Sequence, residues 1–572
     1  MNEHGLIATL AFALGSAFLL GLLARKLRLP PVVGYLLAGI AVGPFSPGFV
    51  ADQALATQLA DIGIVLLMFG VGIEFSLRDL LRVRHVALPG AVAQIAVTTA
   101  VTTLVVSAWG WSGVSGIVLG VALSIASTVV VVRALTDRGL LDTAQGHVAL
   151  GWLIVQDLVT VLVLVLLPTL AVAAAKDVAP SDIAIAVGIS LAKVALLAAI
   201  VVVVGTRVVP WALAVVARTG SRELFTLAVL ALALGIAFAS SALFGVSLAL
   251  GAFLAGTAVS GSDVSHHAAA EALPLRDAFA VLFFVSLGML FDPGFVVAQP
   301  GIVVALLAIV LLLNPLLGIA GVLVAGRSLR TGAIVGAGLA QIGEFAFIVS
   351  EAGRSLGLVP QEARAAVLSV ALLSISLNPL MFAAAGPLER WLGSLAPLRG
   401  AIEARAGELA RVPGDRPRRH AVLIGHGRVG TIVGEALGRR GFAFVVVDND
   451  RRTVEALRGR GLTGIYGDGG SAEVLERAGI GEALLCVVAT SDPVTARRAV
   501  ENARRLNPRI HVVARTHSEE EWSYLRANGA DVPIFAEREV AAALTGQVLR
   551  RYGLSPQEVD AIVRGLRQRP EA

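Results

Sequence analysis

The residue best placed to do chemistry in this 572-residue sequence is Asp157, a lone carboxylate preceded by Gln156 in an otherwise apolar segment. If the helix begins near Gly146, Asp157 lies about 16 Å along it, at the centre of a bilayer. A carboxylate costs at least about 2.5 kcal/mol at that depth, which indicates function. Such a group could bind a proton and a monovalent cation in turn. The structural alternative is a polar hydrogen bond between helices or an ion pair with Lys193.

Two interrupted apolar segments could face this carboxylate. One contains Ser127 and Thr128, and the other contains Gln341 and Glu344 among several glycines. Small and polar clusters of this kind are typical of broken membrane helices, although they also occur where membrane helices pack closely. The candidate ion-binding residues are Gln156, Asp157, Ser127, Thr128, Gln341 and Glu344.

A glycine motif in the last third of the chain predicts nucleotide binding. Gly425, Gly427 and Gly430 follow a short apolar stretch, and Asp448 ends the next one. The glycines would allow a tight turn, close approach of a pyrophosphate and helix packing, while the acid would bind a ribose. A Rossmann-like sheet that binds no nucleotide is the alternative. The candidate residues are Gly425, Gly427, Arg428, Val429, Gly430 and Asp448, with Asp468, Thr490 and Arg515 near the ends of strands expected at 464–468, 484–492 and 510–515.

Composition places these residues in a membrane protein with a soluble tail. Hydrophobic residues make up 56% and charged residues 15%, against about 25% charged in soluble domains, and the mean hydropathy is +0.81. The basic side chains of the tail alternate with acids and lack interleaved aromatics, which argues against nucleic-acid binding. The single cysteine, Cys486, excludes an intrachain disulfide and argues against a Cys/His metal site, so we expect no metal cofactor.

About thirteen apolar spans precede the tail, and they set its orientation. Lys and Arg near the span ends fall almost wholly on one side, so the positive-inside rule predicts a periplasmic N-terminus and a cytoplasmic tail in a bacterial inner membrane. The expected divisions are a membrane exchanger domain at 1–388, a linker at 389–416, a Rossmann-like α/β domain at 417–540 and a helical tail at 541–572.

The membrane part contains an internal repeat. Gly34–Gly39 is similar to Gly251–Gly256, and Leu66–Gly72 is similar to Leu282–Gly288. The matched spans are seven apart, an odd number, so the two halves cross the bilayer in opposite senses. Inverted repeats of this kind are typical of secondary transporters with a central substrate site.

These features resemble the Kef-type monovalent cation:proton antiporters of the second group, most closely their YbaL-like branch. The resemblance is carried by the repeat motifs, by Ala126–Thr128, by Gln156-Asp157, by Gln341–Phe345 and by the tail glycines. It implies an all-α membrane domain with crossed broken helices, Asp157 as the ion-binding carboxylate, a homodimer in the lipid bilayer and a TrkA-N (regulator of potassium conductance) tail. It also implies K⁺ efflux against proton entry, with NAD(H) or AMP as regulatory nucleotide. Many relatives carry a lysine where this chain has Asn314-Pro315, which leaves the stoichiometry open.

Three alternatives stay open from the sequence. A Na⁺/H⁺ antiporter would have the same fold. A nucleotide-gated potassium channel is disfavoured because no Thr-Val-Gly-Tyr-Gly-like filter sequence is present. A membrane-bound NAD-dependent enzyme is disfavoured because no nucleophile and base pair can be identified in the tail, so we expect the protein not to be an enzyme.

Overall fold

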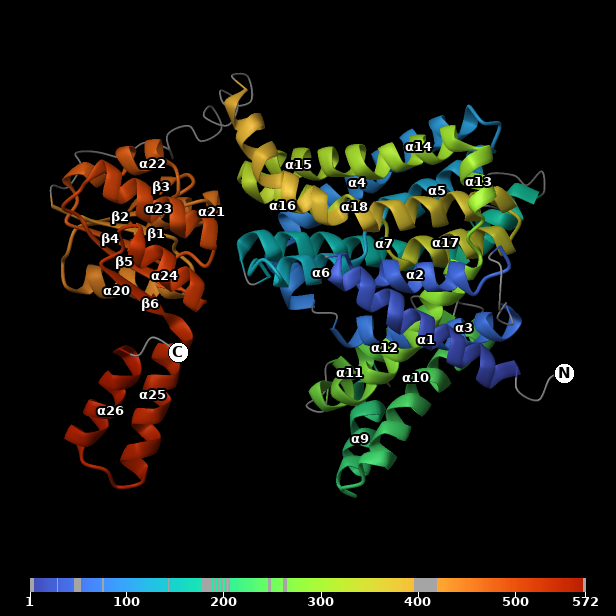
Figure 1. Cartoon of the computed structure of the whole chain (residues 1–572), viewed down its shortest axis with the longest axis horizontal. Coiled ribbons are helices and arrows are strands. Elements are labelled where there is room, and N and C mark those ends of the chain that lie inside the picture. The colour runs from blue at the N-terminus through green and yellow to red at the C-terminus, as the bar shows by residue number, and fades with distance from the viewer. Residues whose placement is uncertain are drawn as a thin grey trace. The chain divides into compact units, whose positions relative to one another are not determined.

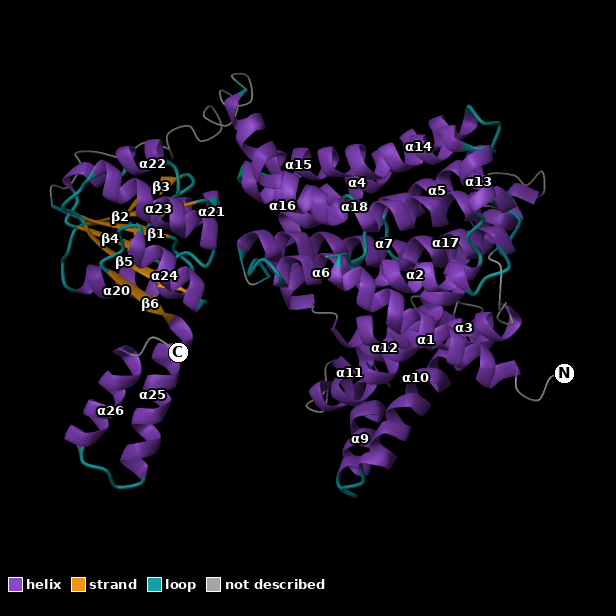
Figure 2. Ribbon diagram, viewed as in Figure 1, coloured by secondary structure: helices purple, strands orange, loops and turns teal. Residues whose placement is uncertain are grey.

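The computed structural model describes residues 5–27, 29–45, 53–74, 77–141, 143–175, 206–244, 248–260, 265–395 and 419–568, with scattered residues between 185 and 203. The chain divides into two compact units. The first comprises Met1–Ala134, Gln145–Ala325 and Gly332–Pro387, and the second comprises Leu135–Ala144, Gly326–Thr331 and Leu388–Ala572. Helices make up the first unit, and the strands belong to the second (Figure 1, Figure 2).

Apolar helices dominate the chain up to residue 394. They are α1 (Gly5–Lys26), α2 (Pro31–Ala41), α3 (Gln53–Glu74), α4 (Leu77–Ser107), α5 (Gly113–Ser124), α6 (Thr128–Thr136), α7 (Ala144–Ala175), α9 (Thr206–Ala217), α10 (Arg222–Phe244), α11 (Leu248–Ser260), α12 (Ser265–Met289), α13 (Pro293–Ala298), α14 (Pro300–Ala308), α15 (Asn314–Val324), α16 (Leu329–Leu339), α17 (Glu344–Ser355) and α18 (Gln361–Ser394). Within the described residues, seven helices are long and apolar enough to cross a membrane, or eight with the bent pair α16 and α17. The expected thirteen spans are not confirmed by this count, because several apolar helices are shorter and most of 176–205 lies outside the described residues.

Local sequence explains several helix ends. The Ser112 side chain accepts a hydrogen bond from the Ser115 backbone N–H at 3.1 Å and so caps α5. A π-helical turn, η2 (Ile309–Leu313), separates α14 from α15. It lies directly before Asn314-Pro315, where the proline lacks the N–H that would continue regular α-helical pairing. The wider π-helical turn therefore lies next to Asn314, one of the few polar side chains of this span.

Four glycines of the repeat motifs allow two close helix crossings. A Cβ atom added at Gly39 on α2 would lie 2.7 Å from the Gly288 Cα on α12. A Cβ atom added at Gly72 on α3 would lie 2.9 Å from the Gly256 Cα on α11. The repeat equates α2 with α11 and α3 with α12, so the two crossings are equivalent. This equivalence supports the inverted repeat found in the sequence.

Two broken helices cross within the first unit. The first is α5 and α6, interrupted at Ile125–Ser127, and the second is α16 and α17, interrupted at Ala340–Gly343 and bent by 47°. The two breaks touch, because the Gly343 N–H donates to the Ile125 carbonyl at 2.9 Å. The Gln341 Nε2 also donates to the Ser127 carbonyl at 3.2 Å. The crossed broken helices expected from the sequence are therefore present.

The second unit is built on a parallel six-stranded sheet of order β3-β2-β1-β4-β5-β6. The strands are β1 (Ala421–Ile424), β2 (Phe444–Asp448), β3 (Thr463–Tyr466), β4 (Leu485–Val488), β5 (His511–Thr516) and β6 (Val532–Phe535). The strand order reverses at β1, which lies between β2 and β4, so the ligand crevice of such a sheet falls at the carboxyl end of β1. This Rossmann-like arrangement confirms the fold expected for the tail.

Helices cover the sheet and extend beyond it (Figure 2). They are α20 (Arg428–Arg439), α21 (Arg451–Gly459), α22 (Ala472–Arg477), η4 (Ile480–Glu482), α23 (Pro493–Leu506), α24 (Glu519–Ala527), α25 (Ala536–Arg551) and α26 (Pro556–Gln568). Strand β6 was not expected from the sequence. It is a four-residue edge strand that contains Pro533, and proline is tolerated at a sheet edge. The helix α18 continues to Ser394, and most of the expected linker at 389–416 lies outside the described residues.

Candidate functional site

Asp157 lies on α7 and faces the first break. Its side chain is 6% exposed, and its Oδ2 accepts a hydrogen bond from the Thr128 hydroxyl at 3.2 Å. Thr128 is the first residue of α6, so the hydroxyl comes directly after the break. The structure thus brings together Asp157 and Thr128, as the sequence predicted. The alternative partner, Lys193, lies outside the described residues.

A second carboxylate lies at the other break. Glu344 is the first residue of α17 and is 2% exposed. The Ser127 hydroxyl donates to its Oε2 at 3.1 Å. A negative charge at a helix N-terminus is stabilised by the helix dipole, which favours an acid at this position. Ser127 at the end of the break and Thr128 at the start of α6 therefore bind the two buried carboxylates.

Three buried oxygen atoms at the crossed breaks lack a hydrogen-bond partner among the described residues. They are the Asp157 Oδ1, the Glu344 Oε1 and the Gln341 Oε1. A buried acceptor left unsatisfied costs about 1–3 kcal/mol, more when it is charged. All three are acceptors with no donor among them, so a proton or a cation would satisfy them. Oxygen atoms are the ligands that hard cations prefer.

Gln156 is engaged with the backbone of the first break. Its Nε2 donates to the Ser124 carbonyl and to the Gln94 Oε1, both at 2.8 Å. Its Oε1 accepts from the Ala126 N–H at 3.1 Å. Both amide hydrogens are therefore used, and the side chain holds the chain where α5 ends.

A neutral hydrogen-bond network extends from Gln156 to Asn314. The Asn314 Oδ1 accepts from the Thr98 hydroxyl at 2.7 Å and from the Gln94 Nε2 at 3.0 Å, and its Nδ2 donates to the Leu123 carbonyl at 2.8 Å. The network thus connects α4, α5, α7 and α15 without a formal charge. Gln94 and Thr98 were not predicted from the sequence. They are two polar residues inside an apolar span, and this position could have indicated them.

The glycine motif of the tail has the expected geometry. Gly425 directly follows β1 and has φ +90°, a conformation that glycine adopts without strain. A Cβ atom at Gly430 would lie 1.9 Å from the Gly425 carbonyl oxygen, so only glycine fits there. A Cβ atom at Gly427 would meet nothing within 4 Å. The backbone before α20 is therefore open to a ligand, as a pyrophosphate at a helix N-terminus requires.

Asp448 orders the loop around this opening. Its Oδ2 accepts from the His426 N–H at 2.7 Å and its Oδ1 from the Asp450 N–H at 2.8 Å. Burial raises the pKa of the Asp448 carboxyl, and the two backbone N–H donors partly offset that effect. The free lone pairs of the same oxygens remain to accept hydrogen bonds from a ribose.

The remaining candidates lie at the carboxyl ends of the strands or on α20. Thr490 packs against Gly425, whose added Cβ would lie 3.0 Å from the Thr490 nitrogen, and Asp468 accepts from the Gly470 N–H at 2.9 Å. Burial lowers the pKa of Arg515, the negative charge of Glu537 partly offsets this effect, and the positive charge of Arg428 adds to it. The Arg515 Nε is buried with no partner in the described part of the chain. Val429 lies in the first turn of α20 and is exposed.

The second unit also contains the segment Gly326–Thr331, which includes the start of α16. Its Arg327 pairs with Asp450 at 2.8 Å, two residues after Asp448. Its Arg330 pairs with Asp492 at 2.9 Å, two residues after Thr490. These ion pairs therefore lie at the carboxyl ends of the strands, where the nucleotide site is expected.

Comparisons with known proteins identify both parts of the chain. The sodium/hydrogen exchanger transmembrane family matches residues 14–385, more than half of the sequence. The chain belongs to the sodium/hydrogen exchanger family. A TrkA-N domain matches residues 421–536. The resemblance to Kef-type antiporters noted in the sequence is confirmed.

Individual relatives cover nearly the whole chain. The YbaL protein of Escherichia coli (strain K12) is 48% identical over 541 residues, which is 94% of this chain and 96% of the relative. The glutathione-regulated potassium-efflux system protein KefC of Escherichia coli (strain UTI89 / UPEC) is 31% identical over 565 residues, which is 98% of this chain and 87% of KefC. The solved structure of the sodium proton antiporter MjNhaP1 from Methanocaldococcus jannaschii has a TM-score of 0.52 at 16% identity and covers 68% of this chain and 100% of that one. The MjNhaP1 match shows a shared fold.

The protein is therefore a membrane-spanning cation/proton antiporter of this family with a TrkA-N regulatory domain. It is a transporter and not an enzyme.

Proposed function

We propose that this antiporter exchanges K⁺ for H⁺ across a bacterial inner membrane, with Asp157 as the group that binds each ion in turn. The observation that carries the proposal is the set of three unpartnered oxygens on Asp157, Glu344 and Gln341. The relative KefC is named for potassium efflux, which favours K⁺ over Na⁺.

Asp157 would perform the exchange by alternating between two partners. When protonated, its carboxyl group is neutral and is stable in a dry site. When it loses the proton, a monovalent cation replaces that charge and is coordinated by Asp157, Glu344 and Gln341. Gln156 and Asn314 hold the break with neutral groups, so one cation replaces one proton and no net charge moves. Thr128 and Ser127 position the two carboxylates throughout the cycle.

The test is dissipation of a pH gradient in proteoliposomes containing the full-length protein on addition of K⁺, Na⁺ or Li⁺. We expect K⁺ to collapse the gradient at the lowest concentration and Asp157→Asn to abolish the response to all three ions. Preference for Na⁺ would make the protein a Na⁺/H⁺ antiporter. A wild-type rate in Asp157→Asn would remove this residue from the mechanism.

We further propose that the domain at 417–540 binds an adenine nucleotide, NAD(H) or AMP, and regulates exchange. The open backbone at Gly427, the ordered acid Asp448, and the guanidinium groups of Arg428 and Arg515 fit the pyrophosphate and ribose of such a ligand. Occupancy can shift transport by the coupling free energy between the two sites, about 1–3 kcal/mol, which is roughly a 5- to 150-fold effect. Gly427→Val fills the opening and should abolish both nucleotide binding and the nucleotide effect on transport, as measured by calorimetry and by proteoliposome flux. Unchanged binding in this variant would contradict the assignment.

The remaining features of the proposed function follow from the family and from the charge pattern. We infer a homodimer with a periplasmic N-terminus, a membrane domain at 1–388, a linker at 389–416 and cytoplasmic regions at 417–540 and 541–572. Protease accessibility of the tail in inverted and right-side-out vesicles tests the orientation.

A further inference from the structure

The four-residue sequence Leu-Asn-Pro-Leu occurs twice in the apolar part of the chain. It lies at 313–316, where η2 meets α15, and at 377–380 within α18. Its asparagines, Asn314 and Asn378, are each 1% exposed. An asparagine buried among apolar helices costs free energy unless its amide is hydrogen-bonded. The proposed exchange uses Asn314, whereas Asn378 has no role in it.

Both asparagines donate to the last turn of a half-helix that ends at a break. The Asn314 Nδ2 donates to the Leu123 carbonyl in the last turn of α5 at 2.8 Å. The Asn378 Nδ2 donates to the Ala337 carbonyl in the last turn of α16 at 2.9 Å. Carbonyls in the last turn of a helix lack the regular α-helical donor. The Ala340 N–H reaches the Ala337 carbonyl at 3.4 Å, so the Asn378 amide makes the shorter of its two bonds.

Helix α18 also binds the backbone of the second break as α7 binds that of the first. Each of these helices follows a broken helix, so the repeat equates them. The Ala126 N–H donates to the Gln156 Oε1 on α7 at 3.1 Å. The Ile342 N–H donates to the Ser374 Oγ on α18 at 3.4 Å. Ser374 and Asn378 are four residues apart and so lie on one face of α18, which binds both an N–H and a C=O group at the second break.

The two breaks differ in where their carboxylate comes from. Asp157 lies on α7, so the helix that holds the first break also carries its carboxylate. The corresponding face of α18 presents the neutral side chains of Ser374 and Asn378. Glu344 belongs to the broken helix itself, as the first residue of α17, and Gln341 lies within the break. The positions of the Glu344 and Gln341 oxygens therefore depend on how the backbone of the second break is held.

We propose that Asn378 is a positioning residue for exchange, because its amide fixes the end of α16 and so sets the place of the Gln341 and Glu344 oxygens. Gln341 follows Ala337 by four residues, which is about one helical turn. Without the Asn378 amide, the Ala337 carbonyl keeps only its 3.4 Å contact, and the break is free to shift. Asn378 acts through these residues and is not itself a cation ligand. This inference rests on the proposed cation site at the crossed breaks.

The test is cation-dependent collapse of a pH gradient in proteoliposomes that contain the full-length protein. In Asn378→Ala, the K⁺ concentration for half-maximal exchange should rise about fivefold, which corresponds to the roughly 1 kcal/mol of one hydrogen bond. A merely structural role would lower the amount of folded protein and the maximal rate, and would leave the half-maximal concentration at the wild-type value. Asn378→Gln keeps a carboxamide donor, so its value should lie closer to that of the wild type.

Ser369→Ala is the matched control, because the Ser369 hydroxyl is also buried on α18 but donates within its own helix, to the Ala365 carbonyl at 2.7 Å. Its half-maximal K⁺ concentration should equal that of the wild type. If Asn378→Ala folds and keeps the wild-type value, or if the control shifts equally, the proposal is wrong. If Asn378→Ala does not fold, an unchanged value in Ser374→Ala, which removes the acceptor of the Ile342 N–H, overturns it.

Failure of the proposed function has a different result from failure of this inference. A wild-type protein that prefers Na⁺ should show the same shift in Asn378→Ala with Na⁺ as the added cation, because the amide positions oxygens that bind either ion. A wild-type protein that exchanges neither ion would overturn the proposed function and this inference with it. Normal exchange in the wild type with no shift in Asn378→Ala would overturn this inference alone.

Discussion

Replacement of Gln156 by leucine tests whether this amide holds the first break or binds the transported cation. Leucine has a similar volume but cannot replace the three hydrogen bonds to Gln94, Ser124 and Ala126. The Ser124 carbonyl keeps its bond from the Gln94 Nε2 at 3.1 Å, whereas the Ala126 N–H loses the Gln156 Oε1 as its acceptor. One orphaned buried donor and one weakened acceptor cost about 2–4 kcal/mol together.

The assay is thermal stability of the full-length protein in detergent, followed by K⁺-dependent flux in proteoliposomes. We expect Gln156→Leu to lower the apparent melting temperature by several degrees and to reduce the maximal rate, because the break loses its fixed position. Gln361→Leu is the matched control at an exposed glutamine, and it should leave both values unchanged. If Gln156→Leu keeps wild-type stability and loses K⁺ affinity alone, the amide is a cation ligand and the reasoning is refuted.

Three further predictions follow from other parts of the molecule. Exchange should build no membrane potential in sealed vesicles, because Gln156 and Asn314 are neutral; a potential detected with a voltage-sensitive dye would contradict this. Burial raises the pKa of the Cys486 thiol to about 12, so the thiol should resist alkylation at pH 8 in the native protein. The contribution of the neutral thiol to stability should be complete below about pH 9 and should be lost as the pH rises towards 12. Rapid labelling of native protein would show that Cys486 is accessible. Arg330→Gln removes the ion pair to Asp492 and should reduce the effect of nucleotide on flux while nucleotide binding, measured by calorimetry, persists.

The sequence predicted the parts of the molecule that a strong local rule governs. Asp157 could be found because a charge in an apolar span is costly, and the breaks could be found because small and polar residues interrupt two spans at the repeat distance. The spacing of Gly425, Gly427 and Gly430 predicted a Rossmann-like tail, because each glycine satisfies a separate steric requirement of that fold.

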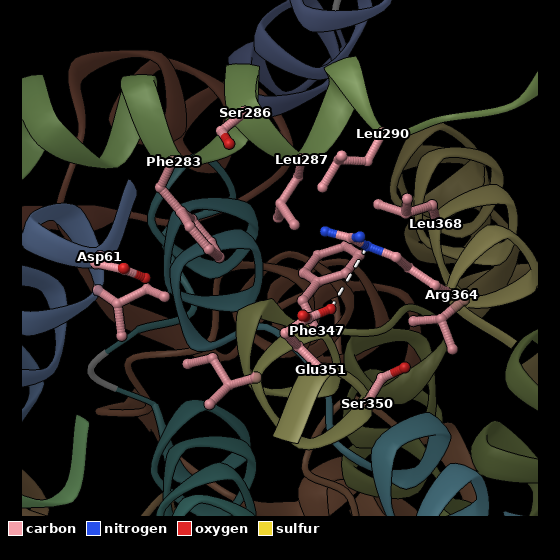
Figure 3. Close-up of a pocket in the computed structure, with 13 residues that line it drawn as sticks. Asp61, Phe283, Ser286, Leu287, Leu290, Phe347, Ser350, Glu351, Arg364 and Leu368 are labelled. Atoms are coloured by element: carbon pink, nitrogen blue, oxygen red, sulfur yellow. Dashed lines mark ion pairs between the residues drawn. The ribbon is translucent and has the colours of Figure 1, made fainter. Parts of the chain in front are cut away.

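Features that depend on distant contacts were not predictable. Gln94 and Asn314 are 220 positions apart in the sequence, and nothing in either segment indicates that their side chains meet at 3.0 Å. Gln156 holds the break through a hydrogen bond to Gln94, so its role depends on that contact. Strand β6 was missed because four residues that include a proline give little local indication of a strand. The cavity between α3, α12, α17 and α18 (Figure 3) is lined by residues from four helices, so its polar lining has no sequence pattern.

The glycine crossings restrict how this chain can change over evolutionary time. At Gly39 and Gly288 an added methyl group would lie 2.0 and 2.1 Å from a backbone oxygen of the opposite helix, and at Gly72 and Gly256 it would lie 2.2 and 2.1 Å away. The obstructing atoms belong to the main chain, which is the same for every amino acid. A second mutation that trims a neighbouring side chain therefore cannot rescue the first. In a saturation-mutagenesis library these four positions should each be intolerant, and no pairwise covariation should connect them to their neighbours.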